Sequence, residues 1–188
     1  MNTKMTTGLL VAGGLAVLAM VVTFARPAAK DDQGFAALGF GDLSAEEFSN
    51  ASHEILPEML AVIYRAFSET EAEQLYDSLA QVSADEALET LYLARMGAMV
   101  GGGLDEGNQE LHAMELEGLA SQRTGTTFRM NATWRVVGTV GHATHLHVRG
   151  NTYAADLTVE PVGGEWRMTS FELTDVDRAD AGTVVVAE

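Results

Sequence analysis

Cysteine is absent from this chain of 188 residues, and lysine does not occur after Lys30. Without cysteine the protein cannot use disulfide bonds, thiolate nucleophiles or cysteine ligands for zinc. Basic residues are scarce: all 27 acidic residues but only 10 of the 11 basic ones follow Ala25, so that part carries 10 minus 27, or −17. This field repels nucleic acid and anionic lipid headgroups, so we expect no nucleic-acid partner. Such an excess of acidic residues is typical of a solubilising surface, and it also suits docking on a basic partner.

Charged residues are missing from one long run, MTTGLLVAGGLAVLAMVVTFA, at residues 5–25. Roughly 20 apolar residues at about 1.5 Å each cross the hydrocarbon core of a bilayer. A cleaved signal peptide is the alternative, but its apolar region is shorter and ends in a small-x-small site, which Thr23 disfavours here. The run therefore predicts an uncleaved transmembrane helix after a short N-terminus at residues 1–4. Small residues that recur every four positions favour close helix packing within the membrane, namely Gly8, Ala12 and Ala16.

The charges that flank this run leave its orientation ambiguous. Lys4 precedes it, whereas Arg26 and Lys30 follow it. Large domains translocate with little regard to such charges. A short N-terminus and a long C-terminal domain suit a signal anchor, so we expect a single-pass protein of the bacterial inner membrane. Its domain would lie in the periplasm.

The region after the run divides into a linker at residues 26–43, an α+β domain at 44–178 and a flexible tail at 179–188. Three capping-box patterns, Ser-x-x-Glu beginning at Ser44, Ser68 and Ser83, mark helix starts. Pro57 suits the first turn of a helix and not its interior. These signals predict short helices at 44–55, 57–67, 70–81 and 84–100.

The second half of the domain changes to a period of two, which is typical of strands with one buried face. Phe128, Met130, Ala132 and Trp134 alternate with polar residues, and a similar alternation runs through 152–159. A turn at Gly163–Gly164 precedes a last strand, with a bulge expected at Ser170–Phe171, and 110–120 is a weaker strand. Helices before an antiparallel meander predict an α+β fold, with short helices packed on the concave face of a curved four-stranded antiparallel sheet.

The closing segment, NTYAADLTVEPVGGEWRMTSFEL at residues 151–173, resembles the last hairpin of NTF2-like (cystatin-like) domains. Those domains commonly end in an alternating strand, a glycine turn and then Gly-x-Trp-Arg or Gly-x-Trp-Lys. The resemblance implies helices on a four-stranded meander. The superfamily includes isomerases and dehydratases with a pocket between sheet and helices. It also includes non-catalytic domains behind a single membrane span, and the layout here is similar to this second group.

Three of the five histidines lie in GHATHLHVRGN, at residues 141–151. On an extended strand His145 and His147 share a face with Arg149, whereas His142 falls on the opposite face unless the turn rotates it. Two imidazoles at this spacing can share a divalent transition metal, although a third ligand such as His112 is needed and the charge of Arg149 opposes a cation. The alternatives are a polar strand face that pairs with carboxylates, a part of a pocket, and a pH-sensitive surface.

A catalytic pocket would draw on Asp156, His145, His147, Tyr153 and Tyr92, but no pair among them has catalytic spacing, and alternation places Asp156 on the outer face. We therefore expect no catalytic residues and no bound cofactor. The sequence predicts a non-catalytic accessory or assembly subunit that docks on a membrane protein complex. One alternative is a periplasmic module that binds a metal or small ligand through the histidines. Another is a pocket enzyme of the isomerase or dehydratase type, which a cavity filled by Trp134, Trp166 and methionines would exclude.

Overall fold

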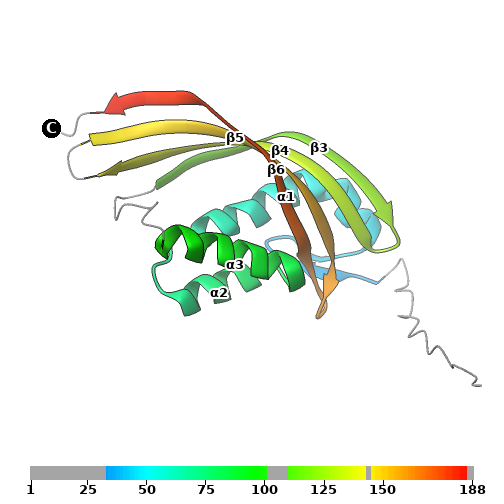
Figure 1. Ribbon diagram of the computed structural model, residues 1–188. Coiled ribbons are helices and arrows are strands. Elements are labelled where there is room, and N and C mark those ends of the chain that lie inside the picture. Colours follow the sequence, from blue (N-terminus) through cyan, green and yellow to red (C-terminus); the bar gives the residue numbers. More distant parts are fainter. Residues whose placement is uncertain (1–32, 101–109, 143–144, 186–188) are drawn as a thin grey trace, which may run out of the picture.

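A six-stranded sheet curls over three helices in the computed structural model, which describes residues 33–100, 110–142 and 145–185 (Figure 1). The strands lie in the order β2-β1-β6-β5-β4-β3. In chain order the elements are β1 (Phe35–Ala37), β2 (Gly41–Leu43), α1 (Ala45–Ala66), α2 (Ala72–Ala80), α3 (Asp85–Val100), β3 (Glu110–Thr124), β4 (Thr127–His142), β5 (His145–Val162) and β6 (Glu165–Val185).

The four long strands, β3 to β6, follow one another as antiparallel neighbours. The predicted turn at Gly163–Gly164 is confirmed, and both glycines have positive φ, 64° and 92°, as a tight hairpin turn requires. The register of β6 against β5 shifts where Met168 pairs with Val159 and Ser170 with Thr158. Thr169 is the extra residue, so the bulge lies just before the predicted position. Such bulges increase the local twist and help the sheet curl.

The predicted four-stranded antiparallel sheet is wrong, because the sheet has six strands and is mixed. The two additional strands, β1 and β2, come from the predicted linker. β1 runs parallel to β6, and the Ala36 amide donates to the carbonyl of Gly164 at 3.0 Å. Burial drives this docking, since the ring of Phe35 meets Trp166 edge-on with centroids 5.5 Å apart. A three-residue strand is too short to show a period, which is why the sequence pattern missed it.

The predicted transmembrane helix at 5–25, with its small residues Gly8, Ala12 and Ala16, lies outside the described residues. Among the helices that the structure describes, none is both long enough and apolar enough to cross a membrane.

Three helices replace the four predicted ones. The capping box at Ser44 is confirmed: the Glu47 amide donates to Ser44 Oγ, and the Ser44 amide donates to Glu47 Oε2 at 2.8 Å. From there α1 runs unbroken through Pro57, so the predicted break is wrong. An interior proline costs about 3 kcal/mol. Leu56 and Leu60, buried on either side of it, oppose that cost by holding the helix on the sheet.

The other two predicted capping boxes are wrong for a shared reason. Ser68 Oγ donates back to the carbonyl of Arg65 at 2.6 Å, and Ser83 Oγ donates back to the carbonyl of Leu79 at 2.7 Å. A serine hydroxyl can cap the end of the preceding helix as readily as the start of the next. Here both serines cap the preceding helix, and α2 begins at Ala72 after the N-cap residue Glu71, which makes no side-chain capping hydrogen bond.

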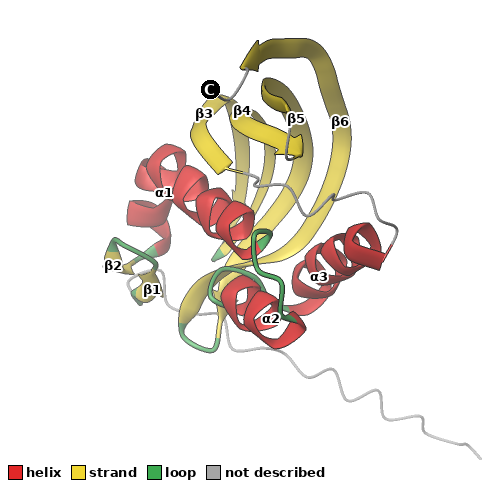
Figure 2. Cartoon of the chain, turned by 90° about the vertical axis from the view of Figure 1, so that its left-hand side faces the viewer, coloured by secondary structure: helices red, strands yellow, loops and turns green. Residues whose placement is uncertain are grey.

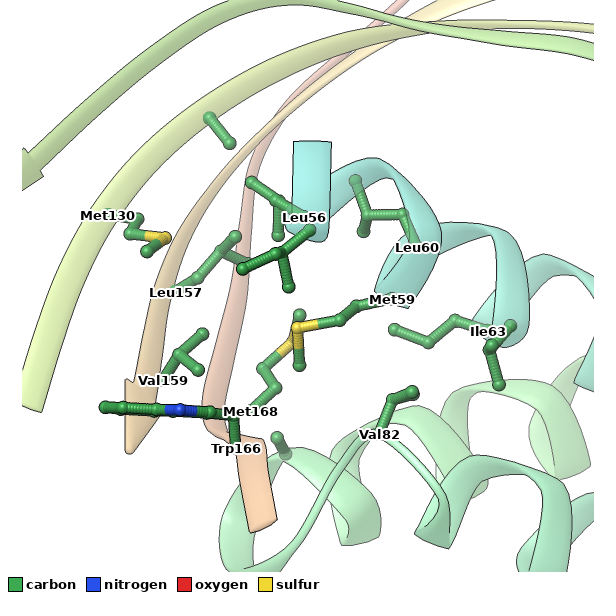
Figure 3. Close-up of a cluster of buried hydrophobic side chains, with 14 of the residues drawn as sticks. Leu56, Met59, Leu60, Ile63, Val82, Met130, Leu157, Val159, Trp166 and Met168 are labelled. Atoms are coloured by element: carbon green, nitrogen blue, oxygen red, sulfur yellow. The ribbon is translucent and has the colours of Figure 1, made fainter. Parts of the chain in front are cut away.

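The core lies between α1 and the concave face of the sheet (Figure 3). The alternation predicted for β4 is confirmed, because Phe128, Met130, Ala132 and Trp134 are all buried. Trp166 stacks on Phe48 with ring centroids 4.3 Å apart, and its Nε1 donates to the carbonyl of Leu43 at 3.0 Å.

The helix pair α2–α3 attaches to β6, which is the outermost of the four long strands on the side away from β3. Met168 in β6 exchanges two backbone hydrogen bonds with the loop before α3: its amide donates to Val82 at 2.8 Å, and its carbonyl accepts from Ala84 at 2.9 Å. α3 then packs along β6, while α1 contacts β3. Figure 2 shows α1 and α3 on opposite sides of the concavity, with α2 beside α3.

Candidate functional site

The histidine stretch lies at the far end of the β4–β5 ladder. In the backbone register, His142 and His145 are Cα partners, His147 pairs with Val140, and Arg149 pairs with Gly138. The side chains of these four residues, and residues 143–144 between the strands, lie outside what the structure describes. Among the described residues no group of three or more histidine, aspartate or glutamate side chains could hold a metal ion. A metal site at the histidines therefore stays a prediction.

Aromatic rings fill the space between α1 and the centre of the sheet. Trp134 is 2% exposed, and its Nε1 donates to the hydroxyl of Tyr64 at 3.0 Å. Tyr153 stacks on Trp134 with centroids 5.8 Å apart, and Phe171 lies against the same indole at 6.5 Å. These rings, together with Trp166 and Met168, belong to the hydrophobic core or pack against it.

The environment of Tyr64 favours its neutral hydroxyl form. Burial raises the pKa of its phenol well above the usual range, the hydrogen bond from Trp134 opposes that rise, and the nearby phenol of Tyr153 adds to it. The neutral hydroxyl therefore serves as the hydrogen-bond acceptor of the buried indole, which would otherwise leave a donor without a partner.

The described candidates for a catalytic pocket do not converge. Tyr153 lies inside, with its hydroxyl accepting from Asn151 Nδ2 at 3.1 Å. Tyr92 lies elsewhere, on α3, where its ring meets Tyr76 of α2 edge-on at 5.8 Å. Asp156 is exposed on the outer face of the sheet, as alternation predicted, and accepts from Asn131 Nδ2 at 2.8 Å.

That outer face carries a polar hollow of about 490 Å³ across β3 to β6, lined by Arg129, Asn131, Asp156 and Glu172 among others. The register brings the outward residues into rows, and one row runs Ala120, Asn131, Asp156, Glu172. An antiparallel sheet commonly leaves one polar face to solvent, so this arrangement alone assigns no ligand.

Arg95 is a charged residue on the side of α3 that faces the interior of the domain, which is an unusual place for a charge. Its Nε and Nη1 are buried and have no hydrogen-bond partner among the described residues, and Nη2 makes a long contact of 3.4 Å with the carbonyl of Glu69. It stands one turn after the buried Leu91, on the face that α3 turns inward. Burial lowers the pKa of its guanidinium from the usual value. Sequence reasoning missed it, because a single arginine in an apolar helix gives no signal.

Apolar side chains are also exposed on both helices of the α2–α3 pair. Leu93 on α3 is 57% exposed and Tyr76 on α2 is 48% exposed, and the ring of Tyr92 lies against Tyr76. We call Tyr76, Tyr92, Leu93 and the exposed Gly97 the α2–α3 patch. The sequence pattern singled out only Tyr92 among them, as a candidate for a catalytic pocket, and did not identify the patch. The available signal was the run Leu91-Tyr92-Leu93, since at about 100° per residue three successive apolar positions cannot share one buried face.

Comparison with known proteins leaves the family open. No family model matches the chain, and no curated protein matches it. Among solved structures, it is similar to the crystal structure of the intermembrane space region of chloroplast protein ARC6. The TM-score is 0.46 and the identity 14%, over 64% of this chain and 95% of that one. A likeness at this level carries no argument, and none of these comparisons tests the resemblance to NTF2-like domains.

Proposed function

We propose that the protein is a non-catalytic accessory or assembly subunit whose domain docks on a membrane protein complex. The apolar run at residues 5–25 would anchor it in the bacterial inner membrane, with the domain in the periplasm. The observation that carries the proposal is the α2–α3 patch. There, Tyr76 and Leu93 expose about half of their surface on two neighbouring helices.

Physical reasoning links such a patch to binding. Single exposed apolar residues are ordinary on protein surfaces, but grouped ones on a strongly acidic domain mark a contact surface. Tyrosine is enriched at interfaces because its ring buries a large area while its hydroxyl keeps a polar partner. In contrast, the indole of Trp134 is buried against the rings of Tyr153 and Phe171, which is typical of a packed core.

Co-purification tests the proposal. The full-length chain, carrying an affinity tag, is isolated from native membranes in mild detergent after crosslinking, and retained proteins are identified by mass spectrometry. We expect a membrane protein to be retained by the wild type and lost from Leu93→Glu. Leu111→Glu is the matched control, because Leu111 is also exposed (37%) but lies on β3, the edge strand that is farthest in the sheet from β6, on which α3 packs. A monomer that retains no protein under these conditions would exclude the docking function.

Membrane attachment is tested separately. We expect the full chain to stay in the membrane fraction after alkaline extraction, and a variant without residues 5–25 to be released. Protease added to spheroplasts should digest the domain of the full-length chain. Digestion only after lysis would place the domain in the cytoplasm and contradict the orientation.

A second candidate is a module that binds a transition metal. It is favoured by the backbone register, which makes His142 and His145 Cα partners at the end of the ladder. Zn²⁺ and Cu²⁺ titrations of the wild type and of a triple variant, His142→Ala/His145→Ala/His147→Ala, decide the matter. Equal binding by both proteins would eliminate the histidines as ligands.

A further inference from the structure

Leu93 belongs to an exposed stripe of α3 on the side opposite the buried one. Glu86, Glu89, Leu93 and Gly97 are all exposed and recur at helical spacing. The opposite stripe, which contains Ala87 and Leu91, is buried against the domain. Figure 1 shows α2 beside α3 below the sheet, and none of the described elements covers their far side.

Gly97 has no internal reason to be glycine. Its φ is not positive, and a Cβ at this position would meet no atom of the described residues within 4 Å. Glycine in an exposed helix interior costs about 1 kcal/mol relative to alanine. A glycine one turn after Leu93 leaves the helix backbone open to close approach by another chain, as small residues do where two helices cross.

The charges around the patch have one sign. Glu73 stands one turn before Tyr76 on α2, and Glu89 stands one turn before Leu93 on α3, and both are exposed. Asp77 and Glu86 extend this acidic border. α2 contains no basic residue, and the single one in α3, Arg95, lies on the inward side with Nη2 directed at the Glu69 carbonyl.

We propose that the α2–α3 patch binds a basic amphipathic helix of the partner protein. The apolar face of that helix would cover Tyr76 and Leu93 and cross α3 at Gly97, while its Lys or Arg residues would pair with Glu73 and Glu89. This inference rests on the proposed docking function and names its surface and the chemistry of its partner. A second copy of this chain is the less suitable occupant, because two acidic borders would repel each other.

Synthetic peptides of about 18 residues, long enough to form a helix, probe the site on the full chain in detergent. One peptide has leucines on one face and lysines on its flanks. A second replaces the lysines with glutamates, and a third has the composition of the first with no apolar face. Fluorescence anisotropy measures affinity. We expect only the first peptide to bind, and we expect its affinity to fall as salt rises from about 0.1 to 1 M, since the Debye length shrinks from about 10 to 3 Å.

Variants locate the site. Leu93→Glu should lower the affinity of the first peptide about tenfold or more, as the loss of a central apolar contact does. Gly97→Gln should also weaken binding while raising the melting temperature, because glutamine is the better helix former. A purely structural role of Gly97 would not give opposite effects on stability and binding. Leu111→Glu should bind as the wild type does.

Several outcomes would overturn the proposal. Equal binding of Leu93→Glu and wild type, or equal binding of the first and third peptides, would remove the patch as the site. A wild-type dimer that Leu93→Glu converts to a monomer would make a second copy the occupant. Binding to phosphatidylcholine vesicles that Leu93→Glu abolishes would make it a lipid surface. If the crosslinked partner stays attached to Leu93→Glu, this inference fails and the docking function stands. If the wild type retains no partner, the function itself fails.

Discussion

Replacing Arg95 with methionine should stabilise the protein, although it removes a charged residue from the interior side of α3. Methionine keeps most of the unbranched apolar stem and deletes the guanidinium. Within the part of the chain that the structure describes, Nε and Nη1 of the guanidinium are buried without partners, and Nη2 contacts the Glu69 carbonyl at 3.4 Å. Native proteins contain few buried donors without partners, so this position is an energetic defect in the domain.

The magnitude follows from three contributions. A buried donor without a partner costs about 1–3 kcal/mol. The long contact with Glu69 is worth at most about 1 kcal/mol. Removing a cation from an acidic domain adds some repulsion, which a Debye length of about 8 Å at physiological ionic strength limits. We therefore expect Arg95→Met to raise the free energy of unfolding by about 1 kcal/mol, and by no more than about 2 kcal/mol.

Urea unfolding followed by tryptophan fluorescence measures this change, because Trp134 and Trp166 are both buried in the native state. The midpoint should rise while the m-value stays constant. Arg129→Met is the matched control, since Arg129 is exposed on the outer face and its loss changes the net charge equally. It should shift stability by less than about 0.5 kcal/mol. A loss of about 1 kcal/mol or more in Arg95→Met, with Arg129→Met neutral, would show that the guanidinium stabilises the fold and would refute the reasoning.

Four further changes test the local structure. Ser44→Ala removes the capping hydroxyl of α1 and should cost about 1 kcal/mol in urea unfolding. Its partner in the box, Glu47, has a pKa lowered by its hydrogen bonds from the backbone and side chain of Ser44. Its stabilising effect is therefore present above the ordinary carboxyl pKa and is lost as the pH falls through the lowered value. Glu47→Gln should consequently unfold at lower urea than the wild type at neutral pH and at the same urea in strong acid. Tyr64→Phe leaves the Trp134 indole donor without a partner and should lower the free energy of unfolding by about 1–3 kcal/mol. A double-mutant cycle with Trp134→Phe should give a coupling energy of about 1 kcal/mol. Additive effects of the two substitutions would contradict the hydrogen bond. Gly97→Ala should raise the free energy of unfolding by about 1 kcal/mol, and destabilisation would show that its Cβ has no room.

The long strands were predictable because the information that specifies them is local. In β4, Phe128 to Trp134 alternate with polar residues, and burial follows that alternation. The hairpin at Gly163–Gly164 likewise depends on backbone freedom that two glycines supply wherever they occur. Alternation also placed Asp156 outside, which removed it from any pocket between helices and sheet.

β1 could not be predicted, because distant residues determine it. Residues 35–37 form a strand only where Phe35 reaches Trp166 and the Ala36 amide reaches Gly164, well over a hundred positions along the chain. Pro57 shows the same principle in a helix. Its local preference is to start a helix, and tertiary packing of Leu56 and Leu60 overrides it. The serine signals failed differently, because one hydroxyl can cap either of two adjacent helix ends.

Tyr64 and Tyr92 illustrate why the candidate docking surface was harder to recognise than the core. Both lie in apolar stripes at helical spacing and both are partly buried against the core, yet Tyr64 accepts a hydrogen bond from Trp134 of the sheet, whereas the ring of Tyr92 meets Tyr76 of α2 edge-on. What separates them is the area that the sheet can cover. β6 covers the side of α3 that carries Leu91, and α2 covers the side of Tyr92, which leaves Leu93 facing outward. An apolar stripe on a helix therefore predicts burial only where another element of the fold covers that side of the helix. Where no element covers that side, an apolar residue stays exposed, as Leu93 does on α3, and under the proposed docking function it is the residue that the partner would cover.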